Sequence, residues 1–338
     1  MTEAESGQAG RTPLVYVCVL NWNSHEDTLR CVAALARSTY KNARVVVADN
    51  ASAEESVKAL RESGLPFEWI LNPSNLGFTG GSNLVMRYGL ERGADYVWLM
   101  NSDALVEPNA LEKLIAAAEA HPQAGILSPV IYFDSDPRVL QSCGMELDLE
   151  TGRFDDLPSL DAADEFMRKE QQRYCLWGTA MLIRRAVIET VGFLDEQFFA
   201  YWEDMDYCAR ARAAGFELRV VPEAAVLHGR LPGPLSNADL RPHRSFYRAR
   251  NAILFWKKHT SGLKRLRYVY WRAATPLRLI YSRPMDQVSA DLTVDGIWCG
   301  LTGKAGVWTE GNRHLKAPPL VKKLLLAYAR WLTPAPRS

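Results

Sequence analysis

The sequence contains no apolar run that approaches the roughly 18 residues needed to cross a bilayer, and residues 1–13 are polar, without the apolar centre of a signal peptide. We therefore expect a protein that is made and kept in the cytoplasm. Its six cysteines are scattered and form no CxxC pair, so neither a zinc site nor a disulfide framework is indicated. We expect the cysteines to be reduced and mostly in the core.

Two common nucleotide-binding signatures are also missing. The pattern GxGxxG does not follow the first apolar segment, and no apolar segment is followed by GxxxxGK with Ser or Thr after it. These glycine patterns cradle the phosphates of dinucleotide cofactors and of ATP. Their absence disfavours hydride transfer and ATP hydrolysis.

Acidic residues are scarce in the last hundred residues. Residues 241–338 contain 19 Lys and Arg against 4 Asp and Glu, a net charge of +15, whereas residues 1–240 contain 21 against 35, a net charge of −14. A basic segment of this kind usually faces an anionic surface, either a membrane leaflet or nucleic acid. Because the segment contains no recognised RNA- or DNA-binding module, we do not expect nucleic acid as a partner.

Short apolar segments alternate with segments of helical periodicity in the first part of the chain. The expected strands cover residues 14–20, 43–48, 67–71 and 96–100. The alternation predicts an α/β fold, a Rossmann-like and mostly parallel sheet with helices on both faces. The expected regions are a disordered leader over 1–13, a main domain over 14–240 and a basic, mainly helical extension over 241–338.

Polar side chains stand where three of the expected strands end. They are Asn21 and Asn23 after the first strand, Asp49 after the second and Asp103 after the fourth. The carboxyl ends of parallel strands share one edge of a sheet, where ligands collect in open α/β folds. A glycine-bearing loop over 72–83 leads into a helix and supplies backbone N–H groups that suit a phosphate. We therefore predict a nucleotide site here, although Asn101-Ser102-Asp103 taken alone is also typical of a simple turn.

A second cluster lies in residues 195–208, where aromatic residues surround several carboxylates. Burial beside aromatic rings raises the pKa of a carboxyl group, as a general base requires. Glu203 and Asp204 are the candidates; alternatively they only begin a helix, expected over 206–214, and favour its dipole. Farther on, His228 follows an apolar segment, and a lone histidine of this kind is more often structural than a metal ligand.

Three further segments are interpreted more simply. The acidic, proline-bearing residues 155–170 are expected to form a surface excursion, and residues 175–183 a strand in which Gly178 allows close approach of a ligand. In the basic region, residues 264–283 interleave Arg with aromatic and aliphatic side chains, as an interfacial helix would. The alternative for that segment is a helix packed on the main domain with a solvated basic face.

Six short elements occur in the same order as in the family 2 glycosyltransferases with the GT-A fold, and the chain resembles the rhamnosyltransferase-like members of that family. The elements are residues 19–24, 47–52, 75–83, 99–103, 202–206 and His228. They extend over residues 14–230, so the resemblance implies a GT-A catalytic domain over 14–240. Residues 245–251 also resemble the segment that follows this domain in the family. The possible contacts to a diphosphate or an anionic acceptor there are Arg248, Arg250 and Lys257.

The resemblance implies a nucleotide-sugar donor and a place for it. Asp49 is implied to contact the pyrimidine base, with Asn21 and Asn23 beside the nucleotide, and the glycine-bearing loop is implied to close over the donor. The loop residues concerned are Asn75, Gly77, Gly81 and Asn83.

The resemblance also implies a divalent cation, Mn²⁺ or Mg²⁺. Asn101-Ser102-Asp103 corresponds to the family's DxD-type motif, in which Asp103 binds the cation that bridges the donor's diphosphate. His228 matches a position that completes the metal's coordination in some members. Asp204 of the family's ED motif, with Glu203 beside it, is implied as the general base that deprotonates the acceptor hydroxyl. The residues implied to line the acceptor side are Trp177, Gly178 and Trp202.

The implied activity is an inverting transfer of a hexose, with rhamnose as one candidate, from a dTDP- or UDP-sugar to a glycan or lipid-linked acceptor in cell-surface polysaccharide synthesis. A leaving diphosphate is stabilised by a hard cation, and the attacking hydroxyl needs a separate carboxylate, so two acidic centres suit this reaction. With its basic region on an anionic leaflet, such an enzyme would be peripheral at the inner face of the plasma membrane.

The chain departs from the family pattern at Asn101, where the motif has its first acid. The metal shell therefore has one fewer carboxylate. This variant occurs in the rhamnosyltransferase-like branch, which favours a dTDP-sugar such as dTDP-rhamnose over a UDP-sugar. It also keeps an alternative open, a protein that binds sugar nucleotides with little or no catalysis.

Overall fold

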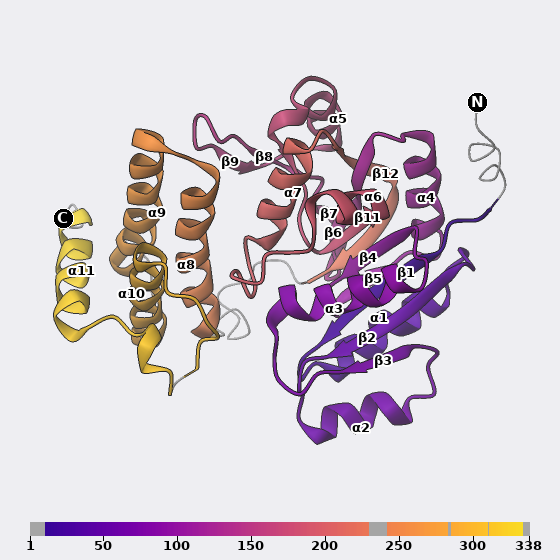
Figure 1. The fold of residues 1–338 in the computed structure, drawn as a ribbon, viewed down its shortest axis with the longest axis horizontal. Coiled ribbons are helices and arrows are strands. Elements are labelled where there is room, and N and C mark those ends of the chain that lie inside the picture. Colours follow the sequence, from indigo (N-terminus) through magenta and orange to yellow (C-terminus); the bar gives the residue numbers. More distant parts are fainter. Residues whose placement is uncertain (1–10, 230–241, 283–284, 310, 334–338) are drawn as a thin grey trace. The chain divides into compact units, whose positions relative to one another are not determined.

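A computed structural model describes residues 11–229, 242–282, 285–309 and 311–333 of the chain (Figure 1). The chain divides into two compact units. The first is drawn from Met1–Glu146, Asp155–Leu194 and Tyr207–Leu231, and the second from Leu147–Phe154, Asp195–Asp206 and Pro232–Ser338. Most of the leader predicted over 1–13 lies outside the described residues.

A nine-stranded sheet forms the centre of the first unit. In sheet order its strands are β3 (Glu68–Leu71), β2 (Ala43–Asp49), β1 (Val15–Asn21), β4 (Tyr96–Met100), β11 (Ala180–Arg184), β6 (Ala124–Phe133), β12 (Glu217–His228) and β5 (Ala104–Val106), and β7 (Asp136–Ser142) pairs with β6. The first four strands run parallel to one another, as the alternation in the sequence predicts. Beyond β4 the sheet is mixed, because β11 runs antiparallel to both of its neighbours.

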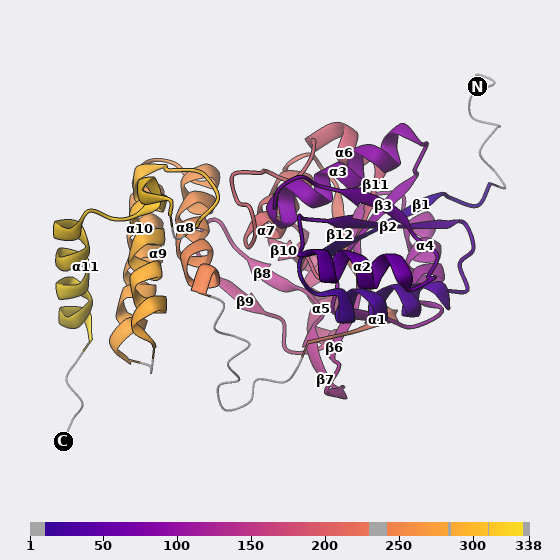
Figure 2. The ribbon, with the colours of Figure 1, turned by 90° about the horizontal axis from the view of Figure 1, so that it is seen from below.

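Helices cover both faces of this sheet. Those up to residue 213 are α1 (His25–Ala36), α2 (Glu54–Glu62), α3 (Gly77–Glu91), α4 (Ala110–Ala120), α5 (Leu160–Lys169), α6 (Arg185–Val191) and α7 (Glu203–Ala213). Figure 2 shows α3 and α6 on one side of the sheet and α1 and α2 on the other. This arrangement confirms the predicted α/β class.

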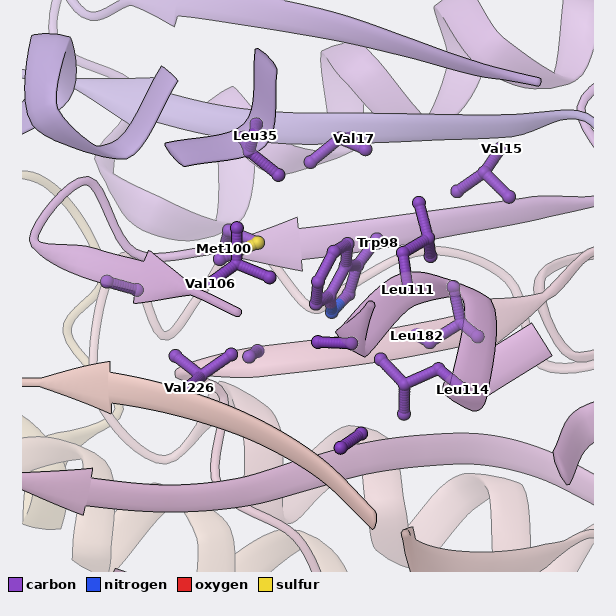
Figure 3. Packing of buried hydrophobic residues seen from close by; sticks show 14 of the residues in the cluster. Val15, Val17, Leu35, Trp98, Met100, Val106, Leu111, Leu114, Leu182 and Val226 are labelled. Carbon is purple, nitrogen blue, oxygen red and sulfur yellow. The ribbon is translucent and has the colours of Figure 1, made fainter. Parts of the chain in front are cut away.

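The main core lies between the sheet and helices α1 and α4. Figure 3 shows Trp98 of β4 beside Leu111 of α4, and Met100 of the same strand beside Val106 of β5. Trp98 and Leu114 are wholly buried. Burial of a large apolar side chain contributes about 1.5–3 kcal/mol, so this layer fixes β4 and the polar residues that follow it. All six cysteines are buried free thiols, which agrees with the sequence-based expectation.

Helix α3 begins at Gly77, whereas the sequence predicted a loop as far as Asn83. Glycine disfavours the helical state by about 1 kcal/mol, which is why the segment looks like a loop. The lack of a side chain at these glycines allows α3 to pack closely on β1. A Cβ at Gly81 would lie 2.3 Å from Leu20 Cδ1, and one at Gly89 would lie 3.1 Å from Tyr16 Cβ.

Two other expectations are wrong in detail. Residues 155–170 contain α5, whose N-cap Ser159 accepts a hydrogen bond from the Ala162 amide and whose Met167 is buried, so this segment is not only a surface excursion. Residues 175–183 are not one strand. Instead, β10 (Tyr174–Cys175) belongs to a small sheet with β8 (Met145–Leu147) and β9 (Phe154–Asp156), and the chain joins the main sheet only at β11.

In the second unit, the basic region forms helices α8 (Pro242–His259), α9 (Gly262–Ser282), α10 (Gln287–Thr302) and α11 (Pro319–Leu332). Helix α10 lies very close to α8, since a Cβ at Gly296 would lie 2.3 Å from the Phe246 carbonyl oxygen. The turn around Gly152 packs on α9, where Arg272 donates to the Gly152 carbonyl at 3.1 Å. No helix in the described part of the chain is long and apolar enough to cross a membrane.

Candidate active site

The ends of β1 and β2 meet at Asn21 and Asp49, which are paired in the parallel register. Asn21 is wholly buried, and its Nδ2 donates to Asp49 Oδ1 at 2.8 Å and to the hydroxyls of Ser52 and Ser56 at 3.1 and 3.2 Å. Its Oδ1 accepts from the Thr28 hydroxyl at 2.9 Å. Such a satisfied buried network is rigid. Asn21 therefore orients the Asp49 carboxylate and the turn that follows it.

The turns after these two strands have an unusual backbone. Asn23 and Ala51, both exposed, have φ angles of 52° and 55°, in the left-handed region that residues other than glycine seldom occupy. The Asn23 Oδ1 accepts from the Ala53 amide at 2.7 Å, which joins the two turns. Backbone strain of this kind gathers at functional sites. The strain supports a ligand site at this edge.

Buried amide side chains fix the start of α3 at the same edge. Asn50 Nδ2 donates to the Gly77 carbonyl at 2.9 Å, and Asn50 Oδ1 accepts from Asn72 at 2.8 Å. The half-buried Asn75 accepts from the Gly77 amide at 2.8 Å. Asn83 is buried and bonds to both the amide and the carbonyl of Leu194, at 2.9 Å each. Sequence reasoning missed Asn50 and Asn72 as organisers of this edge, although both follow strands.

The end of β4 comes together with the end of β12. The antiparallel pairing of β12 with β5 aligns His228 with Ala104, directly after Asp103. His228 Nε2 lies 3.2 Å from Asp103 Oδ1 and 3.2 Å from Asn101 Nδ2. The Asp103 side chain is 46% exposed and that of His228 18%. These three predicted residues, distant in sequence, thus share one small site.

Gln141 of β7, which the sequence did not single out, sets the orientation of the imidazole. Its Oε1 lies 2.8 Å from His228 Nδ1, and an amide oxygen can only accept, so Nδ1 carries a proton. The Asn101 Nδ2, which can only donate, lies 3.2 Å from Nε2 and indicates a lone pair there. That lone pair and the Asp103 carboxylate are two acceptors 3.2 Å apart, which a proton or a cation between them would stabilise. Carboxylate oxygen and neutral imidazole are both ligands for Mn²⁺, so the pair fits a divalent cation.

No group of three or more His, Cys, Asp or Glu side chains suited to a metal ion occurs among the described residues. Asp103 and His228 form a two-ligand pair, with the Asn101 amide beside them.

In the second unit, Glu203 and Asp204 form the first turn of α7, which agrees with the simpler of the two sequence interpretations and leaves the catalytic one open. Both residues are buried: Glu203 is 6% exposed and Asp204 is 8% exposed. Burial raises the pKa of Glu203 well above its usual value, and the negative charges of Asp204 and Asp206 raise it further. Within the described residues, Glu203 Oε2 has no hydrogen-bond partner.

The other two carboxylates of this cluster are bound differently. Asp204 Oδ1 accepts from the Met205 amide at 2.8 Å. Asp206 is wholly buried, and its Oδ1 lies 2.7 Å from both Lys258 Nζ and His259 Nε2. Cationic and hydrogen-bonding partners keep a buried carboxylate charged. The cluster therefore combines Glu203, whose pKa is raised by burial, with an Asp206 carboxylate that two basic side chains contact.

The family model for glycosyltransferase-like family 2 matches residues 12–244. The chain belongs to the family 2 glycosyltransferases. It is 26% identical over 285 residues to N-acetylglucosaminyl-diphospho-decaprenol L-rhamnosyltransferase of Mycobacterium tuberculosis, covering 79% of this chain and 89% of the relative. It is also 22% identical over 250 residues to dTDP-rhamnosyl transferase RfbF of Shigella flexneri, covering 72% and 80%.

A solved structure agrees with this assignment at the level of the fold. Mannosyltransferase PcManGT from Pyrobaculum calidifontis, in complex with GDP-Man and Mn²⁺, superposes with a TM-score of 0.54 at 14% identity, covering 96% of this chain and 86% of that one. The GT-A fold expected from the sequence is thereby confirmed.

Trp177 and Gly178, which the resemblance placed on the acceptor side of this family 2 glycosyltransferase, lie between β10 and β11. The residue Trp177 is 37% exposed, and its Nε1 donates to Asp156 Oδ1 at 2.8 Å. Burial raises the pKa of Asp156, and the indole hydrogen bond opposes that shift. Gly178 is buried. The indole is thus held by its polar end, with part of its ring exposed.

Trp202, the remaining acceptor candidate in the glycosyltransferase, is half-buried in an aromatic cluster. Its ring stacks on Phe154 at 5.0 Å between centroids and lies 5.2 Å from the Phe255 ring. The guanidinium of Arg272 lies 5.8 Å from the same ring. Trp202 is therefore held firmly by its neighbours.

Two basic residues expected to meet an anion are used inside the second unit of the glycosyltransferase. Arg250 is wholly buried and donates to backbone carbonyls, among them that of Gln197 at 2.8 Å. Lys257 Nζ donates to the carbonyls of Gly300 and Leu301 at 3.2 and 3.1 Å. The sequence-based expectation for these two side chains is wrong, because both donate to backbone carbonyls of their own unit.

Proposed function

We propose that this glycosyltransferase transfers a hexose, with dTDP-rhamnose as the first donor to test, to a hydroxyl of a glycan or lipid-linked acceptor in cell-surface polysaccharide synthesis. The observation that carries the proposal is the preformed pair of Asp103 and His228 at the end of β4. The names of the two relatives support a rhamnosyl donor, and that of the mycobacterial enzyme supports a diphospholipid-linked acceptor.

On the donor side, Asp103 and His228 would hold Mn²⁺ or Mg²⁺, with donor oxygens and water as the remaining ligands. When bound, the cation would neutralise charge that develops on the leaving diphosphate. Asn101 is proposed to leave His228 and bond to the donor when the site fills. The exposed carboxylate of Asp103 and the fixed tautomer of His228 support these roles.

The nucleoside is proposed to lie at the ends of β1 and β2. Each Asp49 oxygen accepts one hydrogen bond, from Asn21 or from the Ser52 amide, which leaves lone pairs for the N–H of a pyrimidine base. Asn23 and Asn75, which are partly exposed, are the proposed direct contacts. Four buried or closely packed residues are proposed to hold these contact residues in place without touching the donor. They are Asn21, Gly77, Gly81 and Asn83.

On the acceptor side, Asp204 is the proposed general base, and Trp177, Gly178 and Trp202 are proposed to line the acceptor. The acceptor O–H bond breaks and its proton passes to the Asp204 carboxylate. The acceptor oxygen forms a bond to the anomeric carbon, and the bond from that carbon to the diphosphate breaks, with its electron pair leaving on the diphosphate. Direct displacement of this kind inverts the anomeric centre. The raised pKa of Glu203 supports Asp204 as the charged member of the pair.

Donor identity is tested by thermal shift with a panel of sugar nucleotides, with and without Mn²⁺. We expect the largest stabilisation from dTDP-rhamnose with Mn²⁺, and loss of the Mn²⁺-dependent part in Asp103→Asn. Product formation on a synthetic polyprenyl-diphosphate saccharide is then measured with the same donor. A donor-independent melting temperature together with no transfer would contradict the proposal.

The competing function is sugar-nucleotide binding without transfer, which Asn101 favours because it removes one carboxylate from the motif. Slow hydrolysis of the bound donor distinguishes the two, since a transferase can pass its sugar to water. Hydrolysis that requires Mn²⁺ and Asp204 supports transfer. Binding without hydrolysis or transfer supports the competing function.

The basic region is proposed to contact an anionic membrane surface that carries the acceptor. Large apolar side chains on α9 and α11 are 61–84% exposed, and they are Leu263, Leu266, Leu320, Leu324 and Trp331. Exposed basic residues lie on the same helices, including Lys264 and Lys323. This mixture is typical of interfacial helices, although α9 also buries Tyr268, Leu277 and Ile280 within its unit.

Co-sedimentation with phosphatidylglycerol vesicles tests the membrane contact. We expect binding that falls at high salt and in the double variant Leu320→Ser and Leu324→Ser, whose side chains are exposed and leave the packing intact. Phosphatidylcholine vesicles are the neutral control. Equal recovery with both vesicle types, or none with either, would contradict this part of the proposal.

A further inference from the structure

The segment immediately before α7 has a backbone that its side chains do not favour. Phe199, Tyr201 and Trp202 have φ angles of 63°, 68° and 75°, all in the left-handed region. Side chains with a Cβ seldom adopt this region, and a bulky aromatic residue there is a genuine outlier. Three such residues within four positions therefore need a conformation imposed from outside the segment.

Asn251 of α8 supplies much of that constraint. It is wholly buried, and its Nδ2 lies 2.7 Å from the carbonyl oxygens of Phe198 and Ala200 and 2.8 Å from that of Tyr201. A single amide group thus gathers three carbonyls, which an extended backbone would not direct to one point. The left-handed residues are what turn these carbonyls to one side.

Arg250 completes the arrangement from the neighbouring position. Its Nη2 donates to the carbonyls of Gln197 and Phe198 at 2.8 and 3.0 Å, and its Nη1 to that of Gly306 at 3.0 Å. Its Nε donates to Asn251 Oδ1 at 2.8 Å, which fixes the Asn251 amide with Nδ2 toward the loop. The guanidinium is wholly buried, and burial lowers its pKa.

Side-chain contacts hold the same loop on the same helix. The Phe199 ring stacks on Tyr247 at 4.8 Å, and the Trp202 ring lies 5.2 Å from Phe255. Residues 247, 251 and 255 are spaced four apart and so share one face of α8. This face contacts the loop through the ring of Tyr247, the amide of Asn251 and the ring of Phe255.

We propose that Arg250 and Asn251 are positioning residues for Glu203 and Asp204. The loop they hold ends at Trp202, so its backbone sets where the first turn of α7 begins and where both carboxyl groups point. Lys258 of the same helix binds Asp195 and Asp206, at 2.6 and 2.7 Å, and thereby fixes the two ends of the segment. The catalytic consequence rests on the proposed role of Asp204 as general base.

The test is Asn251→Asp, which keeps the shape of the side chain and replaces its donor by an oxygen facing three carbonyls. We expect kcat for sugar transfer to fall about 10- to 100-fold, because small misplacement of a reacting group has effects of this size. The KM for the sugar nucleotide should not change, since its proposed contacts lie in the first unit. Hydrogen exchange of amides 198–206 should become faster, with that of β1 unchanged.

Lys257→Ala is the matched control, because it also removes donors to two backbone carbonyls from α8 but leaves the loop untouched. We expect it to keep wild-type kcat and wild-type exchange at 198–206. Arg250→Lys, which retains the charge but loses the fork of donors, should show the same pattern as Asn251→Asp in weaker form, and it replaces that variant if Asn251→Asp does not fold.

Wild-type kcat and unchanged exchange in Asn251→Asp would overturn the proposal, as would an equal loss of activity in Lys257→Ala. Faster exchange with unchanged kcat would show that the contacts hold the loop without serving catalysis, and would overturn the positioning role. Inactivity of the wild-type enzyme with every donor would instead refute the proposed function, while hydrogen exchange would still report on the loop.

Discussion

Replacing Glu203 by Gln tests whether the buried carboxyl pair works as one neutral and one charged group. Glu203 is 6% exposed, and the residues that the structure describes supply no partner for its Oε2. Burial, followed by the charges of Asp204 and Asp206, raises its pKa. The folded protein therefore keeps a proton on Glu203 at a pH at which the unfolded chain has released it. Gln has the shape of protonated Glu and does not ionise.

The magnitude follows from proton linkage. Between the ordinary glutamate pKa of about 4.3 and the raised folded value, the folded state holds one more proton, so the free energy of unfolding falls by about 1.4 kcal/mol per pH unit. This stabilisation is complete below the unfolded pKa and is lost as the pH rises through the folded pKa. Glu203→Gln lacks it at every pH. Titrating groups that do not interact with Glu203 contribute equally to both proteins and cancel in the difference.

Urea unfolding at about pH 5, 6 and 7 measures this difference. We expect the free energy of unfolding of Glu203→Gln to rise relative to that of the wild type as the pH rises from 5, by at most about 1.4 kcal/mol for each pH unit. Parallel pH dependences would refute the assignment of a neutral Glu203. In transfer assays Glu203→Gln should stay active, whereas Asp204→Asn should lose about 10²- to 10⁴-fold in kcat. The reverse order of activities would make Glu203 the base.

Three other substitutions have defined outcomes. Asp103→Asn should fold normally, since its side chain is 46% exposed, and should abolish transfer and the Mn²⁺-dependent rise in melting temperature. Gln141→Leu removes the acceptor that fixes His228 Nδ1, so Mn²⁺ affinity, measured by titration, should fall about 10- to 100-fold with the melting temperature nearly unchanged. Gly81→Ala places a Cβ 2.3 Å from Leu20 Cδ1 and should lower the free energy of unfolding, measured in urea, by about 1–3 kcal/mol. Adding Leu20→Ala should remove this clash, although the stabilisation from burial of the leucine side chain is then lost.

The sheet edge at Asn21 and Asp49 was predictable because each polar residue follows a buried apolar strand, and parallel pairing then aligns the strand ends. The contact between Asp103 and His228 could not be predicted from local sequence patterns alone. The two are 125 positions apart, and only the antiparallel pairing of β12 with β5 brings them within 3.2 Å. Gln141 could not be found at all, because a lone glutamine in an edge strand looks like an ordinary exposed polar residue.

The interpretation of charge failed where burial is decided by distant backbone. Arg250 stands in a region with 19 basic residues, which predicts solvent or an anion as its partner. Its actual partners are carbonyls near residue 198, turned toward it by left-handed residues that no sequence pattern indicates. The sequence also placed the start of α3 too late. Its glycines have low helix propensity, but propensity does not show that a glycine at position 81 allows the helix to approach Leu20 closely.

Asn101 shows how a departure from a motif changes the energetics of the site it belongs to. Its Nδ2 lies 3.2 Å from His228 Nε2, so the amide satisfies the lone pair that faces Asp103. A carboxylate at this position would add a third acceptor to two that already lie 3.2 Å apart, and only a cation or a proton would hold the three together. With asparagine the site has one acceptor fewer, and its Nδ2 faces His228 Nε2, so a cation held by the proposed pair would displace that hydrogen bond and would relieve less repulsion. We therefore expect weaker metal affinity than in a site with two acids, which titration of the wild type and of Asn101→Asp with Mn²⁺ would measure.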